Sequence, residues 1–213
     1  DALVLASIVS SPELGNLANK LGVRYEETLT GFKWLANRAM DLEKETGVRT
    51  VFAYEEALGY SVYDLVRDKD GISAAAMCAE MTLYWRSKGK SLLQRLEELY
   101  AQFGYFEDRA ISKGFPGASG SAVMKNIMTK LRTEGLKTLG GKKVTLIRDI
   151  GESISFSPAD PAAKKAIPLP KSNVLQFFLE GGSIVSARPS GTEPKIKFYV
   201  NCVIDNSGNL DSA

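Results

Sequence analysis

The chain has no histidine, two cysteines and no long apolar run. Without imidazole, His-dependent triads, histidine metal sites and imidazole acid–base catalysis are excluded. Cys78 and Cys202 cannot build a disulfide scaffold or a four-ligand zinc site, which favours a reducing, cytoplasmic compartment. No run reaches the roughly 20 apolar residues that a membrane-crossing helix needs, so no membrane partner is expected.

The chain also lacks a strong charge imbalance. Its 27 Lys and Arg residues face 25 Asp and Glu residues, a formal charge of +2. This balance gives no support to a nucleic-acid partner. The 213 residues are 44% hydrophobic, which is enough to form a buried core. That length predicts one large or two small domains.

The first part of the chain alternates between strand and helix patterns. The predicted elements are a strand at 2–9, a helix at 13–21, a strand at 23–28, a helix at 32–40 and a strand at 51–54. Ser11 is expected to cap the first helix, with Pro12 in its first turn. This order predicts a parallel α/β sheet, whose ligands bind beyond the carboxyl ends of the strands. The loops at 28–33 and 55–60 fit that position.

Two further helices follow, and after them the pattern of predicted elements changes. Asp70 is predicted to cap a helix over 71–87, and Ser91 a helix that ends at Phe103. Cys78 lies at helical spacing from apolar neighbours and is expected in the core. Gly104 is the predicted boundary between domains of residues 1–104 and 105–213.

The second part of the chain predicts an α+β domain. Strand patterns occur at 105–111, 143–150, 174–179, 184–187 and 195–203, and a helix pattern at 119–133. Residues 157–173 carry four of the eight prolines and are predicted to form an irregular loop.

Residues 187–197 (ARPSGTEPKIK) hold the densest chemical signal. An oxyanion needs donors from several directions, and this loop supplies a guanidinium, hydroxyls, a glycine for close backbone approach and lysines. The candidate ligands are Arg188, Ser190, Gly191, Thr192 and Lys195. An ordinary polar hairpin with solvated charges is the alternative.

Three other motifs have both functional and structural interpretations. Glu55 and Glu56 directly follow a strand, and paired carboxylates there suit hydrogen bonding to sugar hydroxyls or acid–base work. They also suit a surface turn. Residues 67–71 (RDKDG) place cations near an anionic substrate, or simply open a helix. Residues 30–33 (TGFK) form a binding turn or a helix start with an aromatic anchor.

Taken in order, residues 30–33, 55–60, 67–71 and 188–195 resemble the alpha-D-phosphohexomutase superfamily. This superfamily contains phosphoglucomutases, phosphomannomutases and phosphopentomutases. The resemblance covers nearly the whole chain. It implies most of the third of four domains, a sugar-binding α/β domain, followed by the whole fourth domain. The fourth is α+β and similar to the TATA-box-binding protein.

The resemblance also implies roles for individual residues. Thr30 and Gly31 would lie in the loop that distinguishes sugar orientations, and Glu55 would accept hydrogen bonds from sugar hydroxyls. The loop that contains Arg188, Ser190, Gly191, Thr192 and Lys195 would hold the phosphate that is not being transferred. Lys69 would be a catalytic cation near the transferring phosphate.

This sequence departs from the family pattern at two points. Ala57 stands where many members carry a serine, which removes one hydroxyl contact and favours the branch of phosphopentomutases and sugar-bisphosphate synthases. The phosphoserine loop and the Mg²⁺ loop of the family are absent from the 213 residues. The chain also starts in a core strand without an initiator methionine, so we expect a fragment whose parent contains further N-terminal domains.

The expected parent is an isomerase that interconverts sugar 1-phosphates and 6-phosphates through a phosphoserine and a bisphosphate intermediate. It would use Mg²⁺ and a sugar 1,6-bisphosphate activator. The chain alone, with no metal ligands of its own, is expected to be inactive. A phosphopentomutase, a sugar-bisphosphate synthase and a non-catalytic phosphosugar-binding module are the alternatives.

Overall fold

The structure is a computed structural model that describes residues 1–62, 66–117, 119–191 and 193–204. The chain divides into two compact units. The first comprises Asp1–Phe106 together with Ile204, and the second comprises Glu107–Val203. The sequence places the boundary at Gly104, two residues before this division. No helix in the described part of the chain is both long and apolar enough to cross a membrane.

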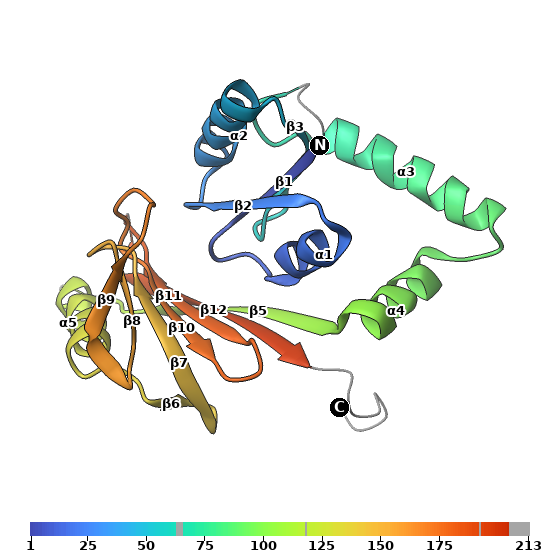
Figure 1. The fold of residues 1–213 in the computed structure, drawn as a ribbon. Helices are drawn as coiled ribbons and strands as arrows, with labels where there is room; N and C mark the ends of the chain where they lie inside the picture. Colours follow the sequence, from blue (N-terminus) through green and yellow to red (C-terminus); the bar gives the residue numbers. More distant parts are fainter. Residues whose placement is uncertain (63–65, 118, 192, 205–213) are drawn as a thin grey trace. The chain divides into compact units, whose positions relative to one another are not determined.

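The first unit contains a four-stranded sheet (Figure 1). Its strands are β1 (Ala2–Ser7), β2 (Arg24–Thr28), β3 (Arg49–Glu55) and β4 (Gly59–Val62), in the order β2-β1-β3-β4. β1 pairs in parallel with both β2 and β3, and β4 pairs antiparallel with β3. The parallel core of the sheet brings the carboxyl ends of β1, β2 and β3 to one edge, as the alternating pattern predicts.

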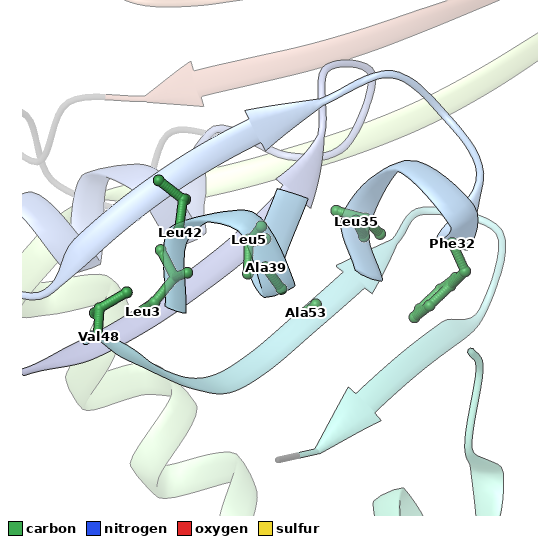
Figure 2. Close-up of a cluster of buried hydrophobic side chains, with 8 residues drawn as sticks. All are labelled: Leu3, Leu5, Phe32, Leu35, Ala39, Leu42, Val48 and Ala53. Carbon is green, nitrogen blue, oxygen red and sulfur yellow. The ribbon is translucent and has the colours of Figure 1, made fainter. Parts of the chain in front are cut away.

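Two helices connect the parallel strands. α1 (Glu13–Leu21) and α2 (Phe32–Thr46) both end at a glycine in the left-handed region. Figure 2 shows the apolar side chains of α2, such as Leu35 and Leu42, packed with Leu3 and Leu5 of β1. This cluster fixes α2, and therefore the loop that precedes it, against the sheet.

The predicted cap of α1 is wrong by one residue. Pro12, rather than Ser11, stands at the N-cap, and the helix begins at Glu13. The Ser11 hydroxyl still accepts a bond from the Glu13 amide, at 3.3 Å. Because Pro12 has no N–H, Glu13 is the first residue that can donate at this end.

The next two helices begin where the sequence predicts. α3 (Gly71–Ser87) starts after Asp70, whose carboxylate accepts the amides of Ile72 and Ser73. α4 (Leu92–Phe103) starts with a complete capping box between Ser91 and Gln94. However, α3 buries none of its residues, and the prediction of a core position for Cys78 is wrong, because its thiol is exposed. Helical spacing from apolar neighbours indicates burial only when another layer covers that face.

The second unit is a sheet that carries one helix. Its strands are β5 (Tyr105–Gly114), β6 (Thr138–Leu139), β7 (Lys142–Asp149), β8 (Ile154–Ser157), β9 (Asp160–Ala166), β10 (Leu175–Leu179), β11 (Ile184–Pro189) and β12 (Lys195–Ile204). The order is β5-β12-β11-β10-β7-β8-β9, with β6 paired to β7. β10 pairs antiparallel with both β7 and β11. α5 (Gly120–Thr133) contributes Met128 to a core with Ile147 and Phe177. An α/β unit followed by an α+β unit confirms the predicted fold class.

The prediction of an irregular loop at residues 157–173 is wrong. β9 occupies residues 160–166 and pairs antiparallel with β8. All its residues are exposed, and it forms one end of the strand order. Pro161 is tolerated there because an edge strand has a side that needs no ladder hydrogen bond. In this segment, Pro161 therefore indicates an edge strand and not an irregular loop.

Candidate functional site

The candidate site of the first unit is built at the carboxyl ends of its parallel strands. β1 ends at Ser7, β2 at Thr28 and β3 at Glu55, and all three residues are buried. A polar residue is costly to bury unless it has a hydrogen-bond partner. Three such residues at one edge of a sheet indicate a site rather than a packing surface.

Gly31 and Glu55 meet at this edge. The Gly31 amide donates a hydrogen bond to Oε1 of Glu55, whose side chain is 8% exposed. Gly31 has φ 120°, a conformation that side chains rarely adopt, so a glycine is needed where the chain turns from β2 into α2. The bond engages one oxygen of the carboxylate. Thr30 precedes Gly31 in the same loop and is partly buried.

Lys69 reaches the same place from the segment that precedes α3. Its amine lies 5.0 Å from the centre of the Phe32 ring and 2.8 Å from Oδ1 of Asp68. A side chain on Gly59 would come within 2.8 Å of the Lys69 methylenes, so a glycine allows lysine to pass over the turn. The Asp68 hydrogen bond, with a weaker contribution from the charge of Glu55, raises the pKa of Lys69. Lys69 is therefore a protonated cation at neutral pH.

The turn after Glu55 joins β3 to β4 with three residues, because Glu55 is the register partner of Gly59. Leu58, its last residue, has φ 59°, as is common for three-residue hairpin connections. Ala57 is exposed in this turn. Its methyl group offers no hydrogen bond where a serine would offer one.

Sequence reasoning missed two hydroxyl groups behind this turn. The hydroxyls of Ser7 and Ser10 are 2.8 Å apart, and the Ser7 hydroxyl donates to Oε2 of Glu56 at 3.4 Å. Both serines are buried. The available signal was that Ser7 and Ser10 lie at the end of the apolar strand β1. The loops at 28–33 and 55–60 were recognised because they follow strands in the same way.

The second unit presents its predicted residues between β11 and β12. Arg188 lies near the end of β11, and Lys195 begins β12. The loop between them is held by hydrogen bonds from the Ser190 amide to the Lys195 carbonyl, 2.8 Å, and from the Glu193 amide to the Ser190 hydroxyl, 3.3 Å. Gly191 is exposed in this loop. Thr192 lies outside the described residues.

Cations concentrate on the two strands that flank this loop. Lys195 forms an ion pair with Glu193 and lowers the pKa of that carboxyl. Arg188 and Lys197 are direct register partners on adjacent antiparallel strands, so their side chains point to the same face. Both are partly buried, and neither forms an ion pair with another described residue. Like charges directly opposite one another destabilise a sheet unless an anion lies between them.

A metal ion such as Mg²⁺ needs several oxygen ligands close together. Among the residues that the structure describes, no group of three or more Asp, Glu or Cys side chains is close enough to hold a metal ion. The residues present therefore do not fit Mg²⁺.

Comparison with known proteins places this geometry in a family. A family model described as phosphoglucomutase/phosphomannomutase, alpha/beta/alpha domain III, matches residues 1–103. A phosphopentomutase from Mus musculus is 38% identical over 205 residues, which are 93% of this chain and 32% of the relative. A phosphoglucomutase from Staphylococcus haemolyticus is 36% identical over 206 residues, 96% of this chain and 37% of the relative.

A solved structure supports the fold. The open form of the exocytosis-sensitive phosphoprotein parafusin, a phosphoglucomutase from Paramecium, has a TM-score of 0.64 at 19% identity. The match covers 94% of this chain and 33% of that chain. The chain thus spans about a third of the length of the relatives that it matches. It belongs to the alpha-D-phosphohexomutase superfamily and corresponds to a C-terminal portion of those longer proteins.

Proposed function

We propose that this chain provides sugar and phosphate recognition in a sugar-phosphate mutase of the phosphoglucomutase/phosphomannomutase type. The observation that carries the proposal is the convergence of Gly31, Glu55 and Lys69 at the strand ends of the first unit. One Glu55 oxygen is held by the Gly31 amide, which leaves the other to accept hydrogen bonds from sugar hydroxyls. Thr30 and Ala57 belong to the two turns that carry Gly31 and Glu55.

In the second unit we assign phosphate binding to the loop of Arg188, Ser190, Gly191, Thr192 and Lys195. The support is electrostatic, because Arg188 and Lys197 face each other with no carboxylate between them in the described residues. A phosphate dianion relieves that repulsion and accepts charge-assisted hydrogen bonds from both. Phosphoryl transfer depends mainly on positioning and charge neutralisation, which this loop supplies.

The proposed parent reaction is an isomerisation in two transfers. A phosphoserine passes its phosphoryl group to the free hydroxyl of a sugar monophosphate, which becomes a bisphosphate. After the sugar reorients, its other phosphoryl group returns to the serine. The pKa of Lys69 is raised, chiefly by the hydrogen bond to Asp68, so Lys69 stays protonated and neutralises charge near the moving group.

The parent enzyme would need parts that this chain does not supply. We assign the phosphoserine and Mg²⁺ to the further length that the relatives possess, and expect a sugar 1,6-bisphosphate as activator. The described residues do not fit Mg²⁺, so no step here depends on it. The two cysteines are free, in keeping with a cytoplasmic, reducing compartment.

A phosphopentomutase or sugar-bisphosphate synthase is the second candidate. Ala57 favours this branch, because it removes a hydroxyl from the turn that we assign to sugar recognition. The mouse phosphopentomutase is also among the most similar relatives. A non-catalytic phosphosugar-binding module would use the same two loops.

The full-length product of the gene tests the proposal. It should isomerise glucose 1-phosphate or mannose 1-phosphate when glucose 1,6-bisphosphate is present, whereas preferential turnover of ribose 1-phosphate selects the pentomutase. The 213-residue chain should bind glucose 1,6-bisphosphate in a calorimeter without turnover. Binding without turnover by the full-length product would indicate the binding module, and an absence of both would reject all of these functions.

A further inference from the structure

The loop after β1 lies between the two loops that we assign to sugar recognition. β1 is the strand between β2 and β3 in the sheet, so the loop that follows it, residues 8–11, leaves the sheet between the loop after β2 and the turn after β3. The Ile8 amide donates to the Thr28 carbonyl at 2.8 Å, and the Tyr54 hydroxyl donates to the Ser11 carbonyl at 3.3 Å. The loop after β1 is therefore bonded to both neighbouring strands.

A directed chain of hydrogen bonds runs from this loop to the turn after β3. The hydroxyl oxygens of Ser7 and Ser10 are 2.8 Å apart, and the Ser7 hydroxyl donates to Oε2 of Glu56 at 3.4 Å. A hydroxyl has one proton, so Ser7 cannot also donate to Ser10. Ser10 therefore donates to Ser7, and Ser7 donates to Glu56. A carboxylate at the end of such a chain polarises both hydroxyls, which strengthens each bond.

Burial makes this chain of bonds specific. Ser7 is 2% exposed and Ser10 is 6% exposed. A hydroxyl buried to that extent is costly without a partner, so the two serines favour the position of Glu56 that satisfies them. Glu56 is partly buried, and it forms no ion pair with another residue that the structure describes. No cation in that part of the chain therefore draws its carboxylate away from the serines.

We propose that Ser7 and Ser10 are positioning residues for sugar recognition and that they act through Glu56. The Gly31 amide holds Glu55 from the loop after β2, and Ser7 holds Glu56 from the end of β1. Two adjacent carboxylates are thus fixed by two different strand ends, which sets the direction in which the free oxygen of Glu55 meets the sugar. Glu55 contacts the sugar, whereas Glu56 anchors the turn. This inference rests on the proposed function, because it concerns the same turn.

Ser7→Ala in the full-length product of the gene tests the proposal, by steady-state kinetics with the sugar 1-phosphate that the protein isomerises fastest. We expect the Michaelis constant to rise about 3- to 10-fold, as the loss of a hydrogen bond of ordinary strength allows, and turnover to change less than about twofold. A misplaced turn weakens binding in the ground state and the transition state alike, which raises the Michaelis constant alone. A loss of turnover at an unchanged Michaelis constant would indicate poorer folding only and would overturn the proposal.

Ser11→Ala is the matched control. Ser11 is a buried serine of the same loop, but its hydroxyl accepts the Glu13 amide at the start of α1. Its removal should leave the Michaelis constant unchanged, whereas Ser10→Ala should raise it as Ser7→Ala does. Equal Michaelis constants in Ser7→Ala, Ser10→Ala and the parent would overturn the proposal.

Glu56→Ala shows whether the serines act through this carboxylate. It should raise the Michaelis constant as Ser7→Ala does, and adding Ser7→Ala to the Glu56→Ala variant should change the constant by less than about twofold. Effects that multiply in the double variant would mean that Ser7 acts on another group, which would also overturn the proposal.

Hydrogen exchange separates this inference from the proposed function. In the full-length protein without substrate, the amides of residues 57–60 should exchange about 3- to 10-fold faster in Ser7→Ala than in Ser11→Ala, because the turn opens more often without its anchor. Unchanged exchange would overturn the positioning role whether or not the protein is a mutase. Faster exchange in a protein that neither binds nor isomerises a sugar phosphate would reject the proposed function and leave the serine anchor standing.

Discussion

The Gly31 amide hydrogen-bonds to the Glu55 carboxylate, across 24 residues of sequence. This bond joins the loop after β2 to the turn after β3, which are the two loops predicted to recognise a sugar. It also orients the carboxylate, since one of its oxygens is engaged. The consequence is that the two loops form one recognition element in the first unit, and that a change at Glu55 affects both.

Glu55→Ala should weaken the binding of glucose 1,6-bisphosphate to the full-length protein by about 10- to 100-fold. A hydrogen bond to a charged group contributes about 1.5–3 kcal/mol, and the substitution also frees the Gly31 loop. Calorimetric titration measures the change. Glu45→Ala, on the exposed end of α2, is the matched control and should bind like the parent. Unchanged affinity in Glu55→Ala would remove Glu55 from the site.

Arg188→Ala should weaken substrate binding by about 1.5–3 kcal/mol, because it deletes a charge-assisted bond to phosphate. The Michaelis constant for a sugar 1-phosphate and a direct titration should both report it. Lys125→Ala removes an exposed cation of α5 and controls for net charge. A variant of Arg188 with unchanged Michaelis constant and turnover would contradict the assignment of the phosphate loop.

Lys197→Gln should have opposite effects on stability and on ligand binding. Without an anion, Lys197 repels Arg188 across the β11–β12 pair, so its removal should raise the free energy of unfolding by about 0.2–1 kcal/mol in low salt. The same variant should gain less stability from added bisphosphate than the parent does. Denaturant titrations with and without ligand measure both quantities. A loss of stability in the absence of ligand would show that the two cations do not repel.

The cap of α3 should depend on pH. Hydrogen bonds from Ser73, and then from the Ile72 amide, lower the pKa of Asp70 from its ordinary 3.8. A lowered pKa means that the carboxylate stabilises the helix above the unfolded value and that this contribution is lost as the pH falls below about 4. Asp70→Ala should therefore lower the melting temperature at pH 7, and its effect should shrink as the pH falls from about 4 to about 2. Asp70→Asn is the control, because asparagine can cap the helix without a charge. An equal fall in melting temperature at pH 7 and at about pH 2 in Asp70→Ala would count against an ionised cap.

Arg132→Ala should destabilise the second unit by about 1–3 kcal/mol. Asp149 is 5% exposed, and its Oδ2 lies 2.9 Å from Nε of Arg132. Among the described residues, the substitution leaves the buried carboxylate with the amides of Gly151 and Glu152 as its remaining donors. Arg109→Ala, which breaks an exposed pair with Glu107, should cost at most about 1 kcal/mol. Equal effects of the two substitutions in urea unfolding would mean that burial adds nothing to the Arg132 pair.

Local signals predicted the starts of α3 and α4. Asp70 and Ser91 each bring a side-chain acceptor to the first amides of a helix, and this chemistry acts within three residues. β1 and β3 were predicted from short apolar runs, whereas β2 was predicted from its alternating pattern. β4, β6, β8 and β9 were missed, because each is short or fully exposed and depends on a neighbouring strand.

Part of the site was predicted because the parallel strands were predicted. Glu55 and Gly31 follow predicted strands, so their approach to one edge came from topology alone. The approach of Lys69 to Glu55 and the hydroxyl pair of Ser7 and Ser10 depend on side-chain directions that no local pattern encodes. Cys78 shows the opposite error, because apolar spacing in α3 predicts burial without showing what provides it.

The strand at the border of the second sheet has a consequence for the behaviour of the chain at high concentration. β9 carries Asp160, Pro161, Lys164 and Lys165 along a fully exposed border. Pro161 has no backbone N–H to donate to a further strand, and Lys164 and Lys165 repel the same lysines of a second copy of the chain. Both features disfavour edge-to-edge pairing of β9 with another strand. The β9 edge should therefore prevent the sheet from extending by edge-to-edge aggregation into fibres.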